Sequence, residues 1–191
     1  MKSTRGSQTE KNLLAAFAGE SQARNRYTYF ASKAREEGFE QISAIFLETA
    51  DNEKEHAKVF FDYLEGGVVA ITAEYPAGKV GSTAENLKAA AEGEKLEWGK
   101  LYPNFAKTAE NEGLKEVAFS FKEIGEVESY HARRYLKLLE NVENGKVFKR
   151  EKPIKWKCRN CGYVHEGLEA PKVCPACKHP QSFYEVWTEN Y

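Results

Sequence analysis

The sequence predicts a mainly α-helical protein, in which a four-helix bundle with one long crossover connection precedes a small metal-bound β domain. Apolar residues recur with helical periodicity through residues 1–145. Glycine and proline gather between residues 66 and 81, and all four cysteines follow residue 157. A chain of 191 residues accommodates one medium domain and a small one. We therefore expect a bundle over 1–145, a basic linker over 146–152 and a metal-binding domain over 153–191.

The first helix is expected to begin at Ser7-x-x-Glu10, which has the pattern of a capping box, and to stop at Gly38. The second helix is expected from about Glu40 to Glu65, ending at the pair Gly66-Gly67. Residues 66–81 contain Pro76 and further glycines, so they form the long connection.

A second capping-box pattern, Ser82-x-x-Glu85, opens the third helix. Gly113 separates this helix from a fourth, which continues to about Asn144. Each of the four helices carries an apolar stripe at three- and four-residue spacing, and acidic residues interrupt every stripe near its middle. The residues that interrupt the stripes are Glu20, Glu53 with His56, Glu94 with Glu97, and Glu128 with His131.

Acidic side chains on inward stripes need a chemical reason, because a lone buried carboxylate costs several kcal/mol unless it is paired, protonated or metal-bound. Glu53-x-x-His56 and Glu128-x-x-His131 repeat one pattern on the second and fourth helices. Residues three apart lie on one helix face, so each pair can offer a nitrogen and an oxygen to metal ions. Two such helices plus a glutamate from each other helix match the di-iron or di-manganese carboxylate site of ferritin-like bundles. The alternative is a set of surface Glu and His residues on acidic helices.

With these motifs, almost the whole chain resembles the rubrerythrin family, a ferritin-like bundle joined to a rubredoxin-like domain. The resemblance implies that Glu53 and Glu128 bridge two irons, and that Glu20, Glu94 and His131 are terminal ligands. It also implies that Glu97 and His56 exchange at one iron between the ferric and ferrous states. Glu97 goes beyond the minimal set of four Glu and two His, which favours this family over other ferritin-like proteins.

Two tyrosines lie close in sequence to the expected ligands. Tyr27 lies seven residues after Glu20, about two helical turns, and Tyr102 lies eight residues after Glu94 and five after Glu97. Each could donate a hydrogen bond to a ligand carboxylate. Each could equally be a packed aromatic residue of the core.

The cysteines form two knuckles, Cys158-x-x-Cys161 and Cys174-x-x-Cys177. Four thiolates in this arrangement make a tetrahedral site for iron or for structural zinc. The run Cys-x-x-Cys-Gly-Tyr followed by Cys-Pro-x-Cys resembles rubredoxin, which favours a mononuclear iron. The short loop between Cys161 and Cys174, and Lys178 where free-standing rubredoxins often have Gly, keep zinc as an alternative.

The resemblance implies a non-haem iron peroxidase that protects against oxidative stress, with three irons per chain. Hydrogen peroxide would be reduced to water at the di-iron site, and the Fe(Cys)4 centre would return electrons one at a time. The reducing power would come from NADH through a separate reductase or a rubredoxin, and no Gly-x-Gly-x-x-Gly motif is present. Zinc or manganese could replace iron. The alternatives are a ferritin-type ferroxidase or iron-handling protein, and a metal sensor with zinc in its cysteines.

A net charge of −1 argues against a nucleic-acid partner. The polar N-terminus and the absence of a stretch of about 20 apolar residues predict a cytoplasmic chain with no membrane partner. A homodimer is expected, in which the tail domain of one chain serves the bundle of the other.

Overall fold

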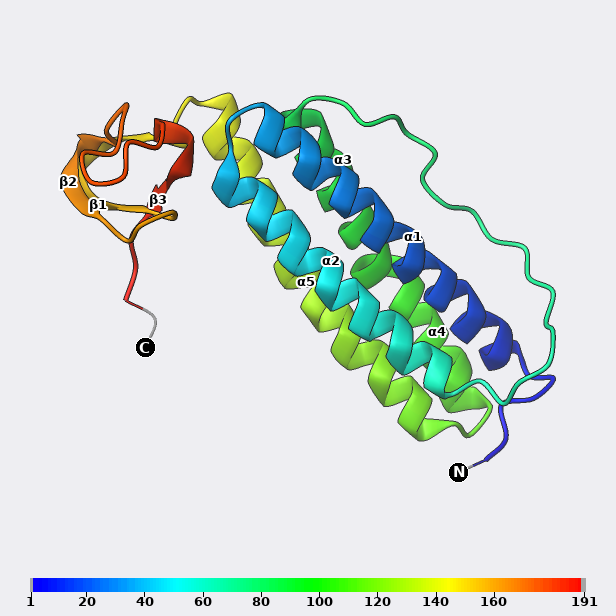
Figure 1. Ribbon diagram of the computed structural model, residues 1–191. Helices are drawn as coiled ribbons and strands as arrows, with labels where there is room; N and C mark the ends of the chain where they lie inside the picture. The colour runs from blue at the N-terminus through cyan, green and yellow to red at the C-terminus, as the bar shows by residue number, and fades with distance from the viewer. Residues whose placement is uncertain (1, 190–191) are drawn as a thin grey trace.

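The computed structural model describes residues 2–189. Five α-helices, α1 (Gln8–Glu36), α2 (Glu40–Asp62), α3 (Thr83–Leu96), α4 (Tyr102–Asn111) and α5 (Lys115–Glu143), form a long bundle. A short π-helical segment, η1 (Glu97–Leu101), joins α3 to α4, so that these elements together make one side of the bundle. Helix α1 packs along α2, and α3 and α4 pack along α5. Residues 63–82 cross from the end of α2 to the start of α3 along the outside of the bundle (Figure 1). The predicted ferritin-like bundle with a long crossover is confirmed.

Local hydrogen bonds fix the ends of the helices. The Ser7 hydroxyl accepts a hydrogen bond from the Glu10 backbone N–H at 3.0 Å. The Glu10 carboxylate accepts from the Gly6 backbone N–H and not from that of Ser7, so the capping box is incomplete. Ser82 and Glu85 form the complete capping box that the sequence predicts. Gly38 takes a left-handed φ of 82°, and this conformation lets the chain turn sharply from α1 into α2.

The helical region differs from the prediction at two points, the end of α2 and the middle of the expected third helix. Helix α2 ends at Asp62, before the expected Glu65, because the Tyr63 carbonyl accepts from the Thr4 hydroxyl and the Glu65 carboxylate accepts from the Thr4 N–H. The single third helix expected between Ser82 and Gly113 is interrupted by η1. Pro103 explains the interruption, because its ring lacks an N–H and collides with the carbonyl four residues earlier in a regular α-helix.

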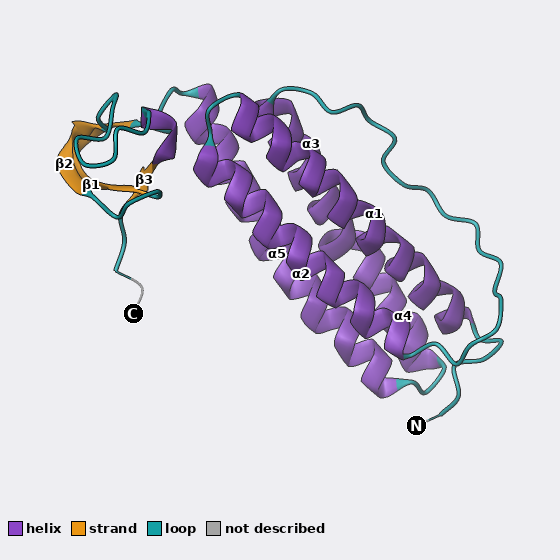
Figure 2. Cartoon of the chain, viewed as in Figure 1, coloured by secondary structure: helices purple, strands orange, loops and turns teal. Residues whose placement is uncertain are grey.

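The small domain follows α5 and lies at the end of the bundle where α1 turns into α2 (Figure 2). Its strands are β1 (Lys149–Cys158), β2 (Val164–Glu169) and β3 (Tyr184–Val186), with β1 in the middle of an antiparallel sheet and a short 3₁₀ turn, η2 (Gln181–Phe183), before β3. Strand β1 begins at Lys149, inside the segment 146–152 expected as linker, because Lys149 pairs with Glu169. The stacked rings of Phe39 and Phe148, 6.1 Å apart, join the two domains.

The bundle core is divided. One apolar cluster surrounds Phe46 and Tyr135 towards the end that carries the small domain, and the other surrounds Phe60 and Phe121 towards the opposite end. Between them lies a layer of buried acidic and imidazole side chains. Among the described helices, none is both long and apolar enough to cross a bilayer.

Candidate metal centres

Four glutamates from four helices meet in the layer between the two apolar clusters. Glu20 comes from α1, Glu53 from α2, Glu94 from α3 and Glu128 from α5, and each side chain is at most 1% exposed. They reach the same layer because each interrupts an apolar stripe whose other members pack above and below it. Four carboxylates buried together repel one another strongly unless positive charge joins them.

His56 and His131 enter this layer one turn after Glu53 and Glu128. The ligand atoms form two groups, Glu20–Glu53–His56–Glu128 and Glu53–Glu94–Glu128–His131, and the atoms of each group lie within 4.8 Å of one another. Both groups contain Glu53 and Glu128. Two cation sites that share two carboxylates are the arrangement in which those carboxylates can bridge a metal pair.

Five of the eight oxygens of these four glutamates lack a hydrogen-bond partner, although His56 Nδ1 lies 2.9 Å from Glu53 Oε2 in hydrogen-bonding geometry. His131 Nδ1 lies 2.7 Å from Glu128 Oε2 and 3.3 Å from Glu53 Oε1, yet none of these three atoms has a hydrogen-bond partner of acceptable geometry. Oε2 of Glu20 and of Glu94 is also buried without a partner. Buried polar atoms are almost always satisfied, so a group of orphaned acceptors at one place fits bound cations. The mixed oxygen and imidazole set suits iron or manganese.

In the absence of bound cations, protons on the carboxyl and imidazole groups reduce the repulsion between the buried charges. Burial and the charges of neighbouring glutamates raise the pKa of Glu20 and of Glu94 well above its usual value. Burial alone would lower the pKa of His56, but Glu128 and Glu53 raise it to about 10, and the same two carboxylates raise the pKa of His131 to about 9. Burial alone would raise the pKa of Glu128, but His131 and His56 hold it down at about 2. Bound metal ions would take the place of these protons.

Both predicted tyrosines contact ligand carboxylates. The Tyr27 hydroxyl donates to Glu94 Oε1, and the Tyr102 hydroxyl donates to Glu20 Oε1. Both rings are also fully buried in the two apolar clusters, so each tyrosine is a hydrogen-bond donor and a core residue at once. The donors hold one oxygen of Glu20 and of Glu94, which leaves the second oxygen directed at the cation sites.

Glu97 stands apart from the other candidate residues. It opens η1, is only half-buried, and belongs to neither ligand group, whereas His56 belongs to one of them. The side chains therefore have the arrangement in which the imidazole, not the Glu97 carboxylate, completes the site with Glu20. π-helical turns commonly occur at functional sites. Pro103 was the sequence signal for this turn.

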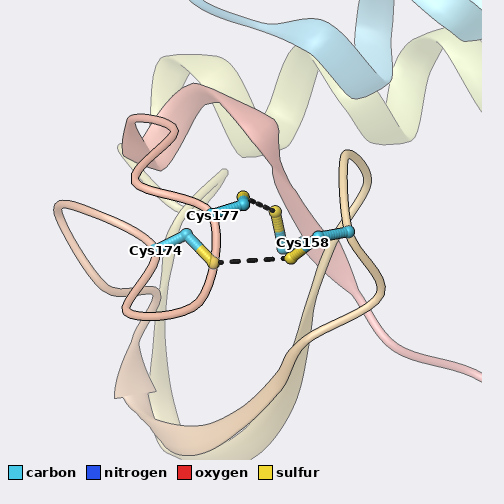
Figure 3. A group of neighbouring side chains, drawn as sticks. Cys158, Cys174 and Cys177 are labelled. Carbon is cyan, nitrogen blue, oxygen red and sulfur yellow. Dashed lines mark hydrogen bonds between the residues drawn. The ribbon is translucent and has the colours of Figure 1, made fainter.

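The four cysteines form a second centre in the small domain, where Figure 3 labels Cys158, Cys174 and Cys177. Cys158 Sγ lies 3.7 Å from Cys177 Sγ, and Cys161 Sγ lies 3.7 Å from Cys174 Sγ, far beyond the length of a disulfide bond. A tetrahedron with metal–sulfur bonds of about 2.3 Å has edges of about 3.8 Å, so the spacing fits an S₄ metal site. The backbone N–H of His179 donates to Cys177 and lowers the pKa of its thiol to about 6. Iron and zinc both fit this geometry.

Comparison with known proteins gives separate family matches for the bundle and for the small domain. A family model described as rubrerythrin matches residues 11–139, and one described as the rubredoxin-like domain of rubrerythrin matches residues 156–185. A rubrerythrin of Porphyromonas gingivalis is 62% identical over 100% of this chain and 95% of its own length. A rubrerythrin of Nitratidesulfovibrio vulgaris is 53% identical, with 100% of both chains covered. Among solved structures, fully reduced, all-ferrous nigerythrin gives a TM-score of 0.63 at 32% identity, covering 97% of this chain and 92% of that one.

Proposed function

This chain belongs to the rubrerythrin family, and from that premise we propose that it is a peroxidase which reduces hydrogen peroxide to water. The observation that carries the proposal is the pair of ligand groups joined by Glu53 and Glu128. Two irons bound there would supply the two electrons that reduction of one peroxide requires. The Cys158–Cys161–Cys174–Cys177 centre would hold a third iron that returns electrons one at a time.

The side chains have distinct parts in this proposal. Glu53 and Glu128 would each hold both metals, while Glu20, Glu94 and His131 would each hold one. His56 would complete the site for ferrous iron, and Glu97 would take its place for ferric iron, because an anionic ligand favours the higher charge. Tyr102 and Tyr27 keep Glu20 and Glu94 oriented through their hydroxyl groups.

Several wider features belong to the same proposal. The electrons come from NADH through a separate rubredoxin or reductase. The chain works in the cytoplasm as a homodimer, in defence against oxidative stress. Its functional units are the bundle 1–145, the connecting segment 146–152, which includes the first residues of β1, and the small domain 153–191. A ferritin-type ferroxidase would have the same bundle site, but oxidation of free Fe(II) does not require a one-electron centre in the same chain.

Replacing Glu128 by Gln tests the shared site. Because Glu128 belongs to both ligand groups, we expect the iron content to fall from three per chain to one, and peroxide turnover to fall by about 100-fold or more. Iron analysis with Mössbauer spectroscopy measures the loss of the coupled pair, and a steady-state assay with a reduced rubredoxin measures turnover.

Glu126→Gln on the exposed face of the same helix is the matched control and should keep three irons. A wild-type protein that oxidises Fe(II) in bulk, but does not consume peroxide at the expense of the donor, would favour the ferroxidase. A Glu128→Gln variant with three irons and a normal Mössbauer spectrum would contradict the shared-ligand assignment.

A further inference from the structure

A cavity of about 780 Å³ lies between the bundle and the crossover. One wall is a face of α1, another is η1 with the start of α4, and residues 70–76 of the crossover form the cover. The crossover runs along this side of the bundle as a single extended segment without helix or strand (Figure 1). The lining includes Glu97 and both tyrosines that contact the ligand carboxylates, Tyr27 and Tyr102. The cavity therefore extends from solvent to side chains that contact the metal layer, which is formed by Glu20, Glu53, Glu94, Glu128, His56 and His131.

This volume is far larger than hydrogen peroxide requires. A water molecule occupies about 30 Å³ in the liquid, and hydrogen peroxide is only one oxygen larger. Two other hollows, of about 550 and 310 Å³, contact none of the metal-layer residues. Of these three hollows, the cavity beneath the crossover is the one lined by Glu97 and by the two tyrosines that donate to Glu20 and Glu94.

Gly19 and Tyr75 line this cavity next to Glu97. The Tyr75 hydroxyl donates to the Ala15 carbonyl at 2.9 Å, which places the ring over α1. A Cβ atom on Gly19 would lie 3.7 Å from Tyr75 Cε1 and 3.9 Å from Glu97 Oε1. A methyl group fits there, but a longer side chain would occupy the space between the tyrosine ring and the glutamate.

We propose that this cavity is the entry passage for the oxidant, that it admits alkyl hydroperoxides as well as hydrogen peroxide, and that Gly19 and Tyr75 set the size limit. The inference rests on the proposed peroxidase function. In the added reaction, ROOH + 2 H⁺ + 2 e⁻ → ROH + H₂O, the O–O bond breaks. Two protons would come from the buffered solvent, and two electrons would come from the reduced iron pair, which the electron donor of the proposed function would then reduce again. The crossover lacks helix and strand over residues 63–82, so it can yield to a larger substrate at low cost.

Competing oxidants of different size test the passage. In the metal-loaded protein we expect turnover of both hydrogen peroxide and tert-butyl hydroperoxide. Gly19→Leu should lower kcat/KM for tert-butyl hydroperoxide about tenfold more than for hydrogen peroxide, because the added side chain occupies the passage. Tyr75→Ala should change the ratio in the opposite direction. Gly78→Leu, in the crossover but outside the cavity lining, is the matched control and should leave the ratio unchanged.

Thiol labelling gives a readout that needs no turnover. In metal-loaded Gly19→Cys the four native cysteines are bound, so the new thiol is the group free to react with N-ethylmaleimide. Gly19 is buried beneath Tyr75, and we expect slow labelling that becomes several-fold faster when Tyr75→Ala is added. Gly78→Cys should label rapidly in both backgrounds.

Three results would overturn the passage. One is reduction of hydrogen peroxide without any reduction of tert-butyl hydroperoxide. The second is an equal loss of both activities in Gly19→Leu at full iron content, and the third is labelling of Cys at position 19 that Tyr75→Ala does not accelerate. Absence of hydrogen peroxide turnover with normal labelling would instead remove the proposed function and leave the passage standing.

Discussion

Tyr102 and Tyr27 occupy comparable places on opposite sides of the metal layer, where each hydroxyl group donates to a carboxylate that also faces a cation site. Residues that orient a metal ligand in this way typically change metal affinity or activity 10- to 100-fold when they are removed. We expect Tyr102→Phe to keep the packing against Phe60 and Phe121 but to release Glu20.

The measurable result of Tyr102→Phe is an Fe(II) affinity of the bundle site, or a peroxide turnover rate, about tenfold below that of the wild type. Fe(II) titration of the metal-free protein measures the first quantity directly. Tyr130→Phe is the control, because Tyr130 is exposed on α5. Equal Fe(II) affinity and turnover in both variants would show that Tyr102 is a packing residue only.

The sequence predicted the residues of the metal layer better than their surroundings. The four buried glutamates stand out because a carboxylate at the centre of an apolar stripe is costly to bury unless a cation or a proton accompanies it. No comparable signal marks Gly19 or Tyr75. Their importance comes from two segments far apart in the sequence that meet over a cavity, and neither periodicity nor spacing encodes that contact.

At the scale of elements, η1 changes the register of its side of the bundle. In an uninterrupted α-helix, Leu101 and Phe105 would continue the inward stripe that contains Glu94, whereas the buried residues after the π turn are Tyr102, Ala106 and Ala109. The stripe has moved by one residue because the π turn holds one residue more than an α turn. This shift is what brings the Tyr102 hydroxyl to Glu20. The helices and the capping box at Ser82 were predictable from local sequence, and Pro103 was a local signal that the helix is interrupted, but neither periodicity nor capping residues predict the one-residue change of register.

A double-mutant cycle isolates the reason for the π turn. Deleting Gly99 should return the segment to a regular α-helix and bring the Pro103 ring against the carbonyl four residues earlier, at a cost of about 3 kcal/mol in the free energy of unfolding. Pro103→Ala alone should change stability little. In the double variant the deletion should cost far less, which gives a coupling energy of about 3 kcal/mol.

Urea unfolding of the metal-free proteins, followed by helical circular dichroism, measures each corner of this cycle. Deletion of Gly78 from the exposed crossover is the control for the loss of one residue and should cost little. Additive effects of the deletion and of Pro103→Ala would show that proline is not the cause of the π turn.

For the whole molecule, the metal layer separates the bundle into two apolar clusters, so the stability of the bundle depends on what neutralises that layer. In the metal-free protein the neutralising agents are protons. The pKa of His56 is raised to about 10 and that of His131 to about 9 in the folded state, mainly by Glu128 and Glu53 once the opposing effect of burial is overcome. A group whose folded pKa exceeds its unfolded pKa stabilises the fold at low pH, and this contribution is lost as the pH rises through the folded value. The raised pKa values of Glu20 and Glu94 act in the same direction from lower pH.

We therefore expect the metal-free bundle to lose stability as the pH rises from 6.5 to 9, by roughly 3 kcal/mol from His56 alone. Glu128 acts in the opposite sense, because its pKa is lowered to about 2, and its contribution is lost only as the pH falls below 4.5. The metal-loaded protein should show no such decline, because cations replace the protons and metal binding strengthens as ligands deprotonate. Thermal unfolding at several pH values, followed by helical circular dichroism with and without iron, compares the two forms. A metal-free protein whose stability is flat or rises between pH 6.5 and 9 would mean that the carboxylates and imidazoles of this layer do not share their protons as the folded geometry requires.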